Sequence, residues 1–129
     1  VVDIDAITEI AKKNGALTVV DSTFTTPFAI KPLEHGADIV IHSMTKFFGG
    51  HSDITAGAIT SSKEIIKKIT PNFLLLGCCL DPNSAWLALR SIRTMKLRVE
   101  RQMENADKIA HALAADPRVK YVNYPSSPA

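Results

Sequence analysis

The sequence predicts an α/β fold, in which helices alternate with the strands of a mostly parallel sheet. Two short apolar runs, residues 17–21 and 38–42, are rich in β-branched side chains and end on a polar one, which is typical of buried strands. The segment between them, residues 22–37, is long enough for a crossover between parallel strands, which needs about a dozen residues or more. Helical spacing of apolar residues on both sides of this pair completes the alternation.

Local signals place the elements of the first half. Apolar residues at helical spacing predict a helix over residues 5–11, and Asn14-Gly15 is a stop signal for it. A third strand is predicted at residues 56–60. The helix predicted at residues 62–69 has a serine-rich start, and serine is a preferred residue at a helix N-terminus.

The second half is predicted to be largely helical. After a loop at residues 71–80, apolar residues recur at helical spacing over residues 84–93 and 96–115, with charges on the other face. Asp116-Pro117 ends this stretch, because the residue before a proline avoids the helical conformation. Residues 119–124 then predict a new strand.

Composition excludes several classes of protein. The 129 residues are 46% hydrophobic and 22% charged, with a net charge of +2, as in an ordinary soluble domain. Basic residues form no block, so charge predicts neither a nucleic-acid partner nor a membrane partner. We find no apolar run of about 18 residues and no signal-peptide pattern, and adjacent Cys78 and Cys79 are typical of reduced thiols. We therefore expect a cytoplasmic protein, of which this chain is a part, since it starts at Val1 without methionine.

The most informative stretch follows the second strand, at residues 42–53. It contains Lys46 between hydroxyl residues, Ser43 and Thr45, and a pair of glycines. A lysine that attacks a carbonyl cofactor needs a partly dry pocket, and the two phenylalanines after Lys46 could form its apolar wall. The hydroxyls suit phosphate oxygens. Asp21, at the end of the first strand, could hold a pyridinium nitrogen protonated.

Three segments of the chain resemble the Cys/Met-metabolism family of pyridoxal 5'-phosphate (PLP) enzymes. They are VVDSTFTTP (residues 19–27), ADIVIHSMTKFFGGHSD (37–53) and LALRSIRTMKLRVERQMENA (87–106). The resemblance covers essentially the whole chain in register. The family includes cystathionine γ-synthase, cystathionine β- and γ-lyases, methionine γ-lyase and O-acetylhomoserine sulfhydrylase.

The resemblance implies a role for each candidate site residue. Lys46 is implied as the catalytic Schiff-base lysine and proton shuttle, and Asp21 as the partner of the pyridine nitrogen. Ser43 and Thr45 are implied to bind the cofactor phosphate, with Thr23 near the ring. No metal ligands are implied.

The resemblance also implies an architecture. We expect residues 1–118 to be the C-terminal part of a fold-type I (aspartate aminotransferase-like) large domain, including a long linking helix. Residues 119–129 would start a small C-terminal domain. Family members are typically homotetramers built from dimers with shared active sites, and several groups of the site are expected outside this chain.

The expected function is a C–S lyase that acts on sulfur amino acids by elimination, of the methionine or cystathionine γ-lyase type. The GGHSD sequence after the lysine favours this branch. The alternative is γ-replacement, as in cystathionine γ-synthase or O-acetylhomoserine sulfhydrylase, and a non-catalytic paralogue that keeps the fold is a third.

Other interpretations of the same residues compete with these. Lys46 alone would be a solvated lysine, and Asp21 a turn former. Ser43-Met44-Thr45-Lys46 matches the S-x-x-K element of β-lactamases, but the S-D-N and K-T-G elements are absent from the sequence. His51 and Asp53 are too few to predict a metal site.

Overall fold

The computed structural model describes residues 2–125. The chain divides into two compact units, Val2–Met95 and a second unit from Lys96 onward. The division falls inside the last helix of the chain. All the strands within residues 2–125, and all the residues expected to form the site, belong to the first unit.

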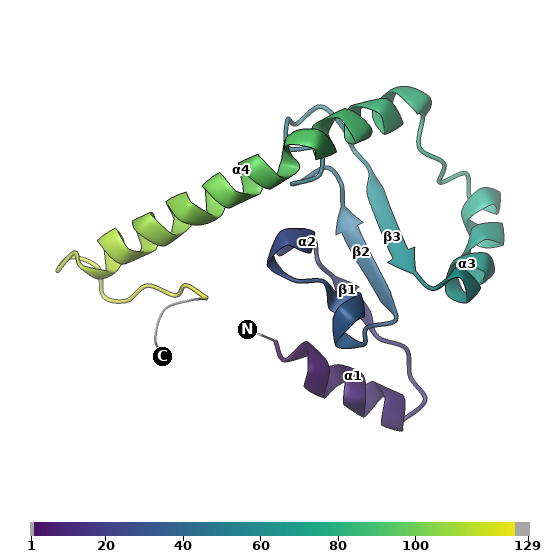
Figure 1. Ribbon diagram of the computed structural model, residues 1–129, viewed down its shortest axis with the longest axis horizontal. Coiled ribbons are helices and arrows are strands. Elements are labelled where there is room, and N and C mark those ends of the chain that lie inside the picture. Colours follow the sequence, from purple (N-terminus) through teal and green to yellow (C-terminus); the bar gives the residue numbers. More distant parts are fainter. Residues whose placement is uncertain (1, 126–129) are drawn as a thin grey trace. The chain divides into compact units, whose positions relative to one another are not determined.

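The first unit is built around a three-stranded sheet in the order β1-β2-β3. Its strands are β1 (Val19–Asp21), β2 (Ile39–Ser43) and β3 (Gly57–Ser61). β1 and β2 are parallel, as predicted, so their carboxyl ends meet at one edge of the sheet (Figure 1). β3 is antiparallel to β2, so the sheet is mixed and the prediction of a mostly parallel sheet is wrong for this strand. The reason is that residues 44–56 form turns without a crossover helix and return the chain directly alongside β2.

The crossover from β1 to β2 carries two short helices, α2 (Thr26–Ala29) and η1 (Pro32–His35). Helix α1 (Ile4–Lys13) packs against η1. The Thr8 hydroxyl joins these helices by donating to the carbonyl oxygen of His35 at 3.0 Å. Prediction and structure agree closely here, because the Asp3 side chain caps α1 and Asn14-Gly15 ends it.

Helix α3 (Lys63–Leu75) starts where expected but runs further than expected. The Ser62 side chain caps it by accepting the N–H of Ile65 at 3.3 Å. The predicted loop at residues 71–80 is wrong in its first half, because the helix continues through Pro71. Proline removes one helical hydrogen bond, but the apolar stripe on the side of α3 toward the strands continues past it. Ile66, Ile69, Phe73 and Leu74 form this stripe.

Helix α4 (Pro82–Ala114) is one continuous helix in place of the two predicted. The residues between the two predicted helices, Thr94 and Met95, include no glycine or proline that would break it. Residues 119–124 are irregular, so the predicted strand is wrong; a strand needs a pairing partner, and every described strand lies in the other unit. The domain boundary after residue 118 stays a prediction, and residues 126–129 lie outside the described residues.

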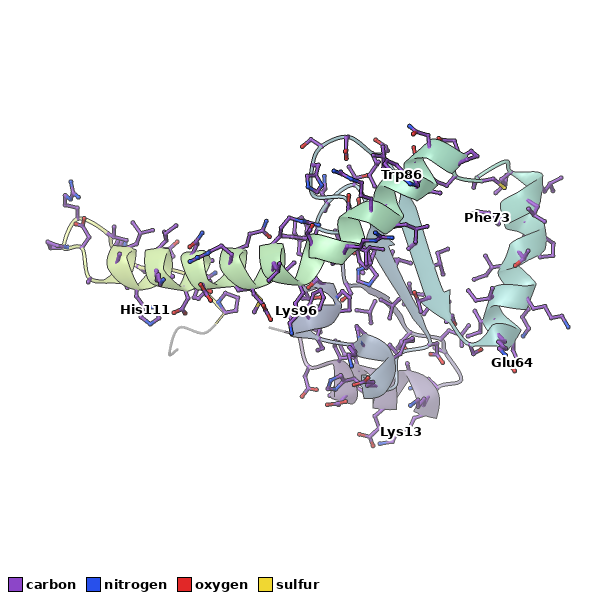
Figure 2. The ribbon with its side chains drawn as sticks, turned by 45° about the horizontal axis from the view of Figure 1, so that its top comes forward. Lys13, Glu64, Phe73, Trp86, Lys96 and His111 are labelled. Carbon is purple, nitrogen blue, oxygen red and sulfur yellow. The ribbon has the colours of Figure 1, made fainter. Side chains whose placement is uncertain are left out.

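The core of the first unit is small. Its buried apolar side chains are Ala37, Val40, Ile54, Ala88 and Met95. Large apolar side chains on one face of the sheet stay exposed, with Val19 at 57% and Ile59 at 46%. Charged side chains such as Lys13 and Glu64 point away from the sheet (Figure 2). Every helix within residues 2–125 is too short or too polar to form a membrane span.

Candidate active site

Asp21 ends β1 and carries an exposed carboxylate at the carboxyl edge of the sheet. The backbone N–H of Thr23 donates to its Oδ1 atom at 3.0 Å. Hydrogen bonds from the Thr23 hydroxyl and then the Thr23 backbone lower the pKa of Asp21 below its ordinary value. Donors that bind the ionised form stabilise it, so Asp21 is a fixed anionic group.

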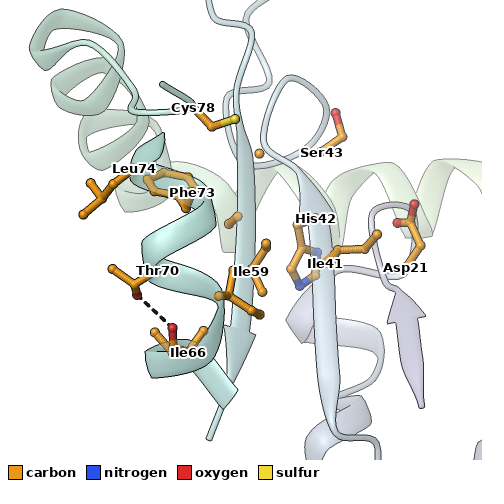
Figure 3. A pocket seen from close by; sticks show the side chains of 13 residues that line it. Asp21, Ile41, His42, Ser43, Ile59, Ile66, Thr70, Phe73, Leu74 and Cys78 are labelled. Atoms are coloured by element: carbon orange, nitrogen blue, oxygen red, sulfur yellow. Dashed lines mark hydrogen bonds between the residues drawn. The ribbon is translucent and has the colours of Figure 1, made fainter. Parts of the chain in front are cut away.

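Ser43 ends β2, beside Asp21 (Figure 3). Its backbone N–H donates to the Thr23 hydroxyl oxygen at 2.8 Å. The hydroxyl oxygen of buried Thr23 therefore accepts from Ser43, while the backbone N–H of Thr23 donates to Asp21. Three of the predicted residues form one connected network. The Ser43 hydroxyl itself has no hydrogen-bond partner among residues 2–125 and is available to a ligand.

Lys46 lies in the tight turn that follows β2. The turn is closed by the N–H of Gly50, which donates to the Lys46 carbonyl at 2.7 Å, and by the N–H of Met44, which donates to Ala56 at 2.9 Å. A Cβ atom on Gly49 would lie 2.8 Å from the side chain of Ile54, so only glycine fits there. The Lys46 side chain is exposed and makes no ion pair within residues 2–125.

Thr45 has a structural contact that the sequence did not predict. Its hydroxyl oxygen accepts the N–H of Ala56 at 3.1 Å, and the carbonyl oxygen of Ala56 lies 3.5 Å away. The first contact holds the two ends of the 44–56 connection together. The second is at the limit of a hydrogen bond, so the hydroxyl proton can be given to a ligand.

The two phenylalanines after Lys46 pack onto the body of the unit. Phe47 meets the edge of Phe24, with ring centroids 6.2 Å apart, and Phe48 lies against His42, with centroids 4.9 Å apart. Both are half-buried, whereas Lys46 is exposed. Within this chain they anchor the turn and do not enclose the lysine.

His51 makes two polar contacts. Its Nδ1 atom lies 2.6 Å from the carbonyl oxygen of Gly49 and 3.4 Å from the Ser91 hydroxyl. Across residues 2–125 no three His, Cys, Asp or Glu side chains gather closely enough to hold a metal ion.

A cavity of about 840 Å³ lies between the sheet and α3, and both Asp21 and Ser43 line it (Figure 3). Most of its remaining lining is apolar and comes from β2, β3 and the stripe on α3. Apolar walls with a few polar groups are typical of sites for small ligands.

The sequence did not predict the structural contacts of Thr23. Thr23 is buried and links Asp21 to Ser43 through its backbone N–H and its hydroxyl oxygen, and its place near the cofactor ring stays a prediction. The available signal was the Asp-x-Thr spacing at a strand end, since aspartate commonly accepts the N–H two residues ahead.

Solved structures of a cystathionine lyase and a cystathionine synthase share the fold of this chain. The crystal structure of cystathionine gamma-lyase from Lactobacillus plantarum complexed with L-serine matches with a TM-score of 0.93 at 36% identity, over 99% of this chain and 34% of that one. The family follows from the sequence. Residues 1–129 match the model of the Cys/Met metabolism PLP-dependent enzymes, and the chain belongs to that family.

Relatives with different activities are similar to this chain to the same degree. L-methionine gamma-lyase of Pseudomonas putida is 43% identical over 125 residues, which are 95% of this chain and 31% of that relative. The chloroplastic cystathionine gamma-synthase 1 of Arabidopsis thaliana is 42% identical over 127 residues, 98% of this chain and 23% of that relative. The chain thus spans about a third or less of the length of these relatives.

The donor groups at the sheet edge fit PLP. PLP presents a pyridine nitrogen, an aldehyde and a phosphate, which call for an anion, a primary amine and hydrogen-bond donors. The edge offers the ionised Asp21 carboxylate, the Lys46 amine and the unpartnered Ser43 hydroxyl.

Proposed function

We propose that the whole protein is a PLP-dependent C–S lyase that acts on a sulfur amino acid by elimination, of the methionine or cystathionine γ-lyase type. The observation that carries this proposal is the Asp21–Thr23–Ser43 network beside the Lys46 turn. The network places an ionised carboxylate and a free hydroxyl at one edge of the sheet, and the turn that directly follows Ser43 carries the exposed amine of Lys46. Ligands of α/β sheets bind beyond the carboxyl ends of the strands.

Each side chain has a definite task in this proposal. When bound, PLP supplies an electron sink for the carbanion formed at the substrate α carbon. Asp21, held ionised by Thr23, keeps the proton on the pyridine nitrogen. Lys46 would hold the cofactor through its carbonyl group, and its amine would take the proton from the α carbon of the substrate. Ser43 and Thr45 donate to the phosphate.

Elimination is favoured over replacement by the GGHSD sequence after Lys46. A γ-replacement reaction, as in cystathionine γ-synthase, is the second candidate, and the similarity to a synthase at 42% identity supports it. The two differ in whether a thiol leaves or enters, and residues outside this chain take part in that choice.

Borohydride reduction of the full-length protein tests the role of Lys46. Reduction fixes PLP on the lysine that binds it, and peptide mapping identifies that residue. We expect the adduct on Lys46, and no adduct in a Lys46→Ala variant. Lys63→Ala is the matched control, because Lys63 is an exposed lysine at the start of α3, away from the sheet edge. An adduct on another lysine contradicts the proposal.

Parallel assays decide between elimination and replacement. The full-length protein would be given methionine, cystathionine, or O-acetylhomoserine with sulfide, and the keto acid and thiol products measured. Keto acid from methionine or cystathionine without added thiol supports the lyase. Product formed only from O-acetylhomoserine with sulfide identifies a replacement enzyme.

We also propose that the whole protein is a cytoplasmic homotetramer with shared active sites. The exposed large apolar side chains of the first unit, such as Val19 and Ile59 on the sheet and Leu75 and Leu76 at the end of α3, support burial by other parts of the assembly, since many exposed apolar side chains on one unit are typical of an interaction surface. Light scattering on the full-length protein measures its mass. A monomer at micromolar concentration contradicts the assembly.

A further inference from the structure

His51 is a side chain close to the Lys46 turn that the proposed mechanism does not use. Its Nδ1 atom lies 2.6 Å from the carbonyl oxygen of Gly49. A carbonyl oxygen only accepts hydrogen bonds, so Nδ1 carries the proton and donates it. The ring of His51 therefore holds one carbonyl group of the turn.

The peptide group that His51 holds is the same one that holds Lys46. The carbonyl of Gly49 and the N–H of Gly50 belong to one peptide bond, and that N–H donates to the carbonyl oxygen of Lys46 at 2.7 Å. The bond is trans, as are all the peptide bonds within residues 2–125. In a planar trans peptide the C=O and the N–H point in opposite directions. His51 and Lys46 thus contact opposite ends of one rigid group, and fixing one end fixes the other.

This peptide group lies between two glycines, so little else fixes its orientation. Rotation of the group changes ψ of Gly49 and φ of Gly50, and neither residue has a Cβ atom that would oppose the change. Gly50 already has a φ of 72°, in the left-handed region that is open to glycine. Backbone sterics therefore leave the orientation of the group open, and its two hydrogen bonds determine it.

The ring of His51 is itself placed by helix α4. The hydroxyl oxygen of Ser91 lies 3.4 Å from Nδ1, which is a weak polar contact. Ser91 is buried, on the same face of α4 as buried Ala88 and Met95, because residues three and four positions apart share a helix face. Figure 1 shows this part of α4 beside the connection that follows β2. One edge of the ring thus meets a helix face, which limits the positions that the ring can adopt.

The residue after His51 has a strained backbone. Ser52 has a φ of 59°, a left-handed conformation that is uncommon outside glycine. Strained backbone persists only where the surrounding structure determines it. The contacts of the His51 ring with Gly49 and Ser91 are contacts of this kind.

We propose that His51 is a positioning residue, whose Nδ1–H fixes the peptide group between Gly49 and Gly50 and thereby holds the backbone of Lys46 where its amine can join the cofactor. This inference rests on the proposed function, because it assigns to Lys46 the carbonyl group of PLP. It adds a residue that acts through Lys46 and touches no ligand.

Two variants of the full-length protein separate the hydrogen bond from the shape of the side chain. The amide nitrogen of His51→Asn reaches the place of Nδ1, whereas His51→Leu has nearly the shape of asparagine and no donor. Absorbance after mixing the apo protein with PLP measures the rate at which Lys46 joins the cofactor. We expect His51→Leu to join PLP about tenfold more slowly, as for the loss of one hydrogen bond, and His51→Asn to stay within about threefold of wild type.

Pyridoxine 5'-phosphate distinguishes positioning of Lys46 from a general loss of structure. This analogue has the ring and phosphate of PLP but an alcohol in place of the aldehyde, so it cannot join the lysine. Both variants should bind it within about twofold of wild type, as for a surface substitution. A His51→Leu protein that binds the analogue tenfold more weakly, or joins PLP at the wild-type rate, overturns the inference. A His51→Asn protein that joins PLP as slowly as His51→Leu also overturns it.

Thermal unfolding of each apo variant identifies one that fails to fold. If His51→Leu fails, His51→Ala carries the same expectation, because it also lacks the donor.

The borohydride experiment separates this inference from the proposed function. An adduct on Lys46 in wild type, together with equal rates of joining in all variants, leaves the proposed function standing and overturns only the role of His51. Failure to label Lys46 in wild type overturns both.

Discussion

A Thr23→Val substitution probes the network that joins Asp21 to Ser43. Valine keeps the branched shape of threonine but has no hydroxyl, so packing is conserved and hydrogen bonding is lost. The N–H of Ser43 loses its acceptor at 2.8 Å, and Asp21 loses the hydroxyl donor that lowers its pKa most. Leaving one buried donor unpaired destabilises a protein by about 1–3 kcal/mol.

Urea unfolding of the full-length apo protein, at one fixed protein concentration, measures this loss through its midpoint. Thr70→Val is the matched control, since the same hydroxyl is removed from an exposed residue whose bond is to a helix carbonyl. We expect the control to change stability by about 0.5 kcal/mol or less.

Acid sensitivity gives a second measure of the same substitution. Because the pKa of Asp21 is lowered in the folded protein, its ionised form stabilises the fold above the pKa of the unfolded chain. That contribution is lost as pH falls through the lower folded pKa. Thr23→Val should bring the two pKa values closer and reduce this part of the pH dependence, since the backbone N–H of residue 23 still donates to Asp21. A variant with wild-type stability and acid profile would refute the reasoning.

Three further outcomes are expected in the full-length protein. Gly49→Ala should destabilise the Lys46 turn by about 1–3 kcal/mol, since the new methyl group would meet Ile54 at 2.8 Å. Gly57→Ala is the control and should change the urea midpoint little, because the nearest contact of its methyl group would be 3.8 Å away. Equal effects of the two substitutions would contradict the steric argument. Ser62→Ala should lower stability by about 1 kcal/mol through the lost helix cap, and an unchanged midpoint would show that the cap is dispensable. Burial lowers the pKa of His42, so the stability of the wild-type protein should decline as pH falls below about 6.5. The His42→Gln variant should lack this part of the decline. A difference in stability between the two proteins that does not change with pH would contradict this prediction.

The order of the elements was accessible from sequence because their signals are local. Apolar runs rich in β-branched residues marked β1 and β2, and the Ser62 cap marked the start of α3. The end of α3 and the irregular course of residues 119–124 were not accessible. Whether the helix continues through Pro71, and whether residues 119–124 pair as a strand, depends on what each segment packs against. No local sequence pattern carries that information.

The sequence by itself determined the family and gave Lys46 and Asp21 as candidates for the site, because both depend on residue type and spacing along the chain. The tertiary structure decided which groups touch. It set β3 antiparallel to β2 and made Thr23 the bridge from Asp21 to Ser43. Those contacts join residues about twenty positions apart in the chain, and only the pairing of β1 with β2 brings such residues within hydrogen-bond distance.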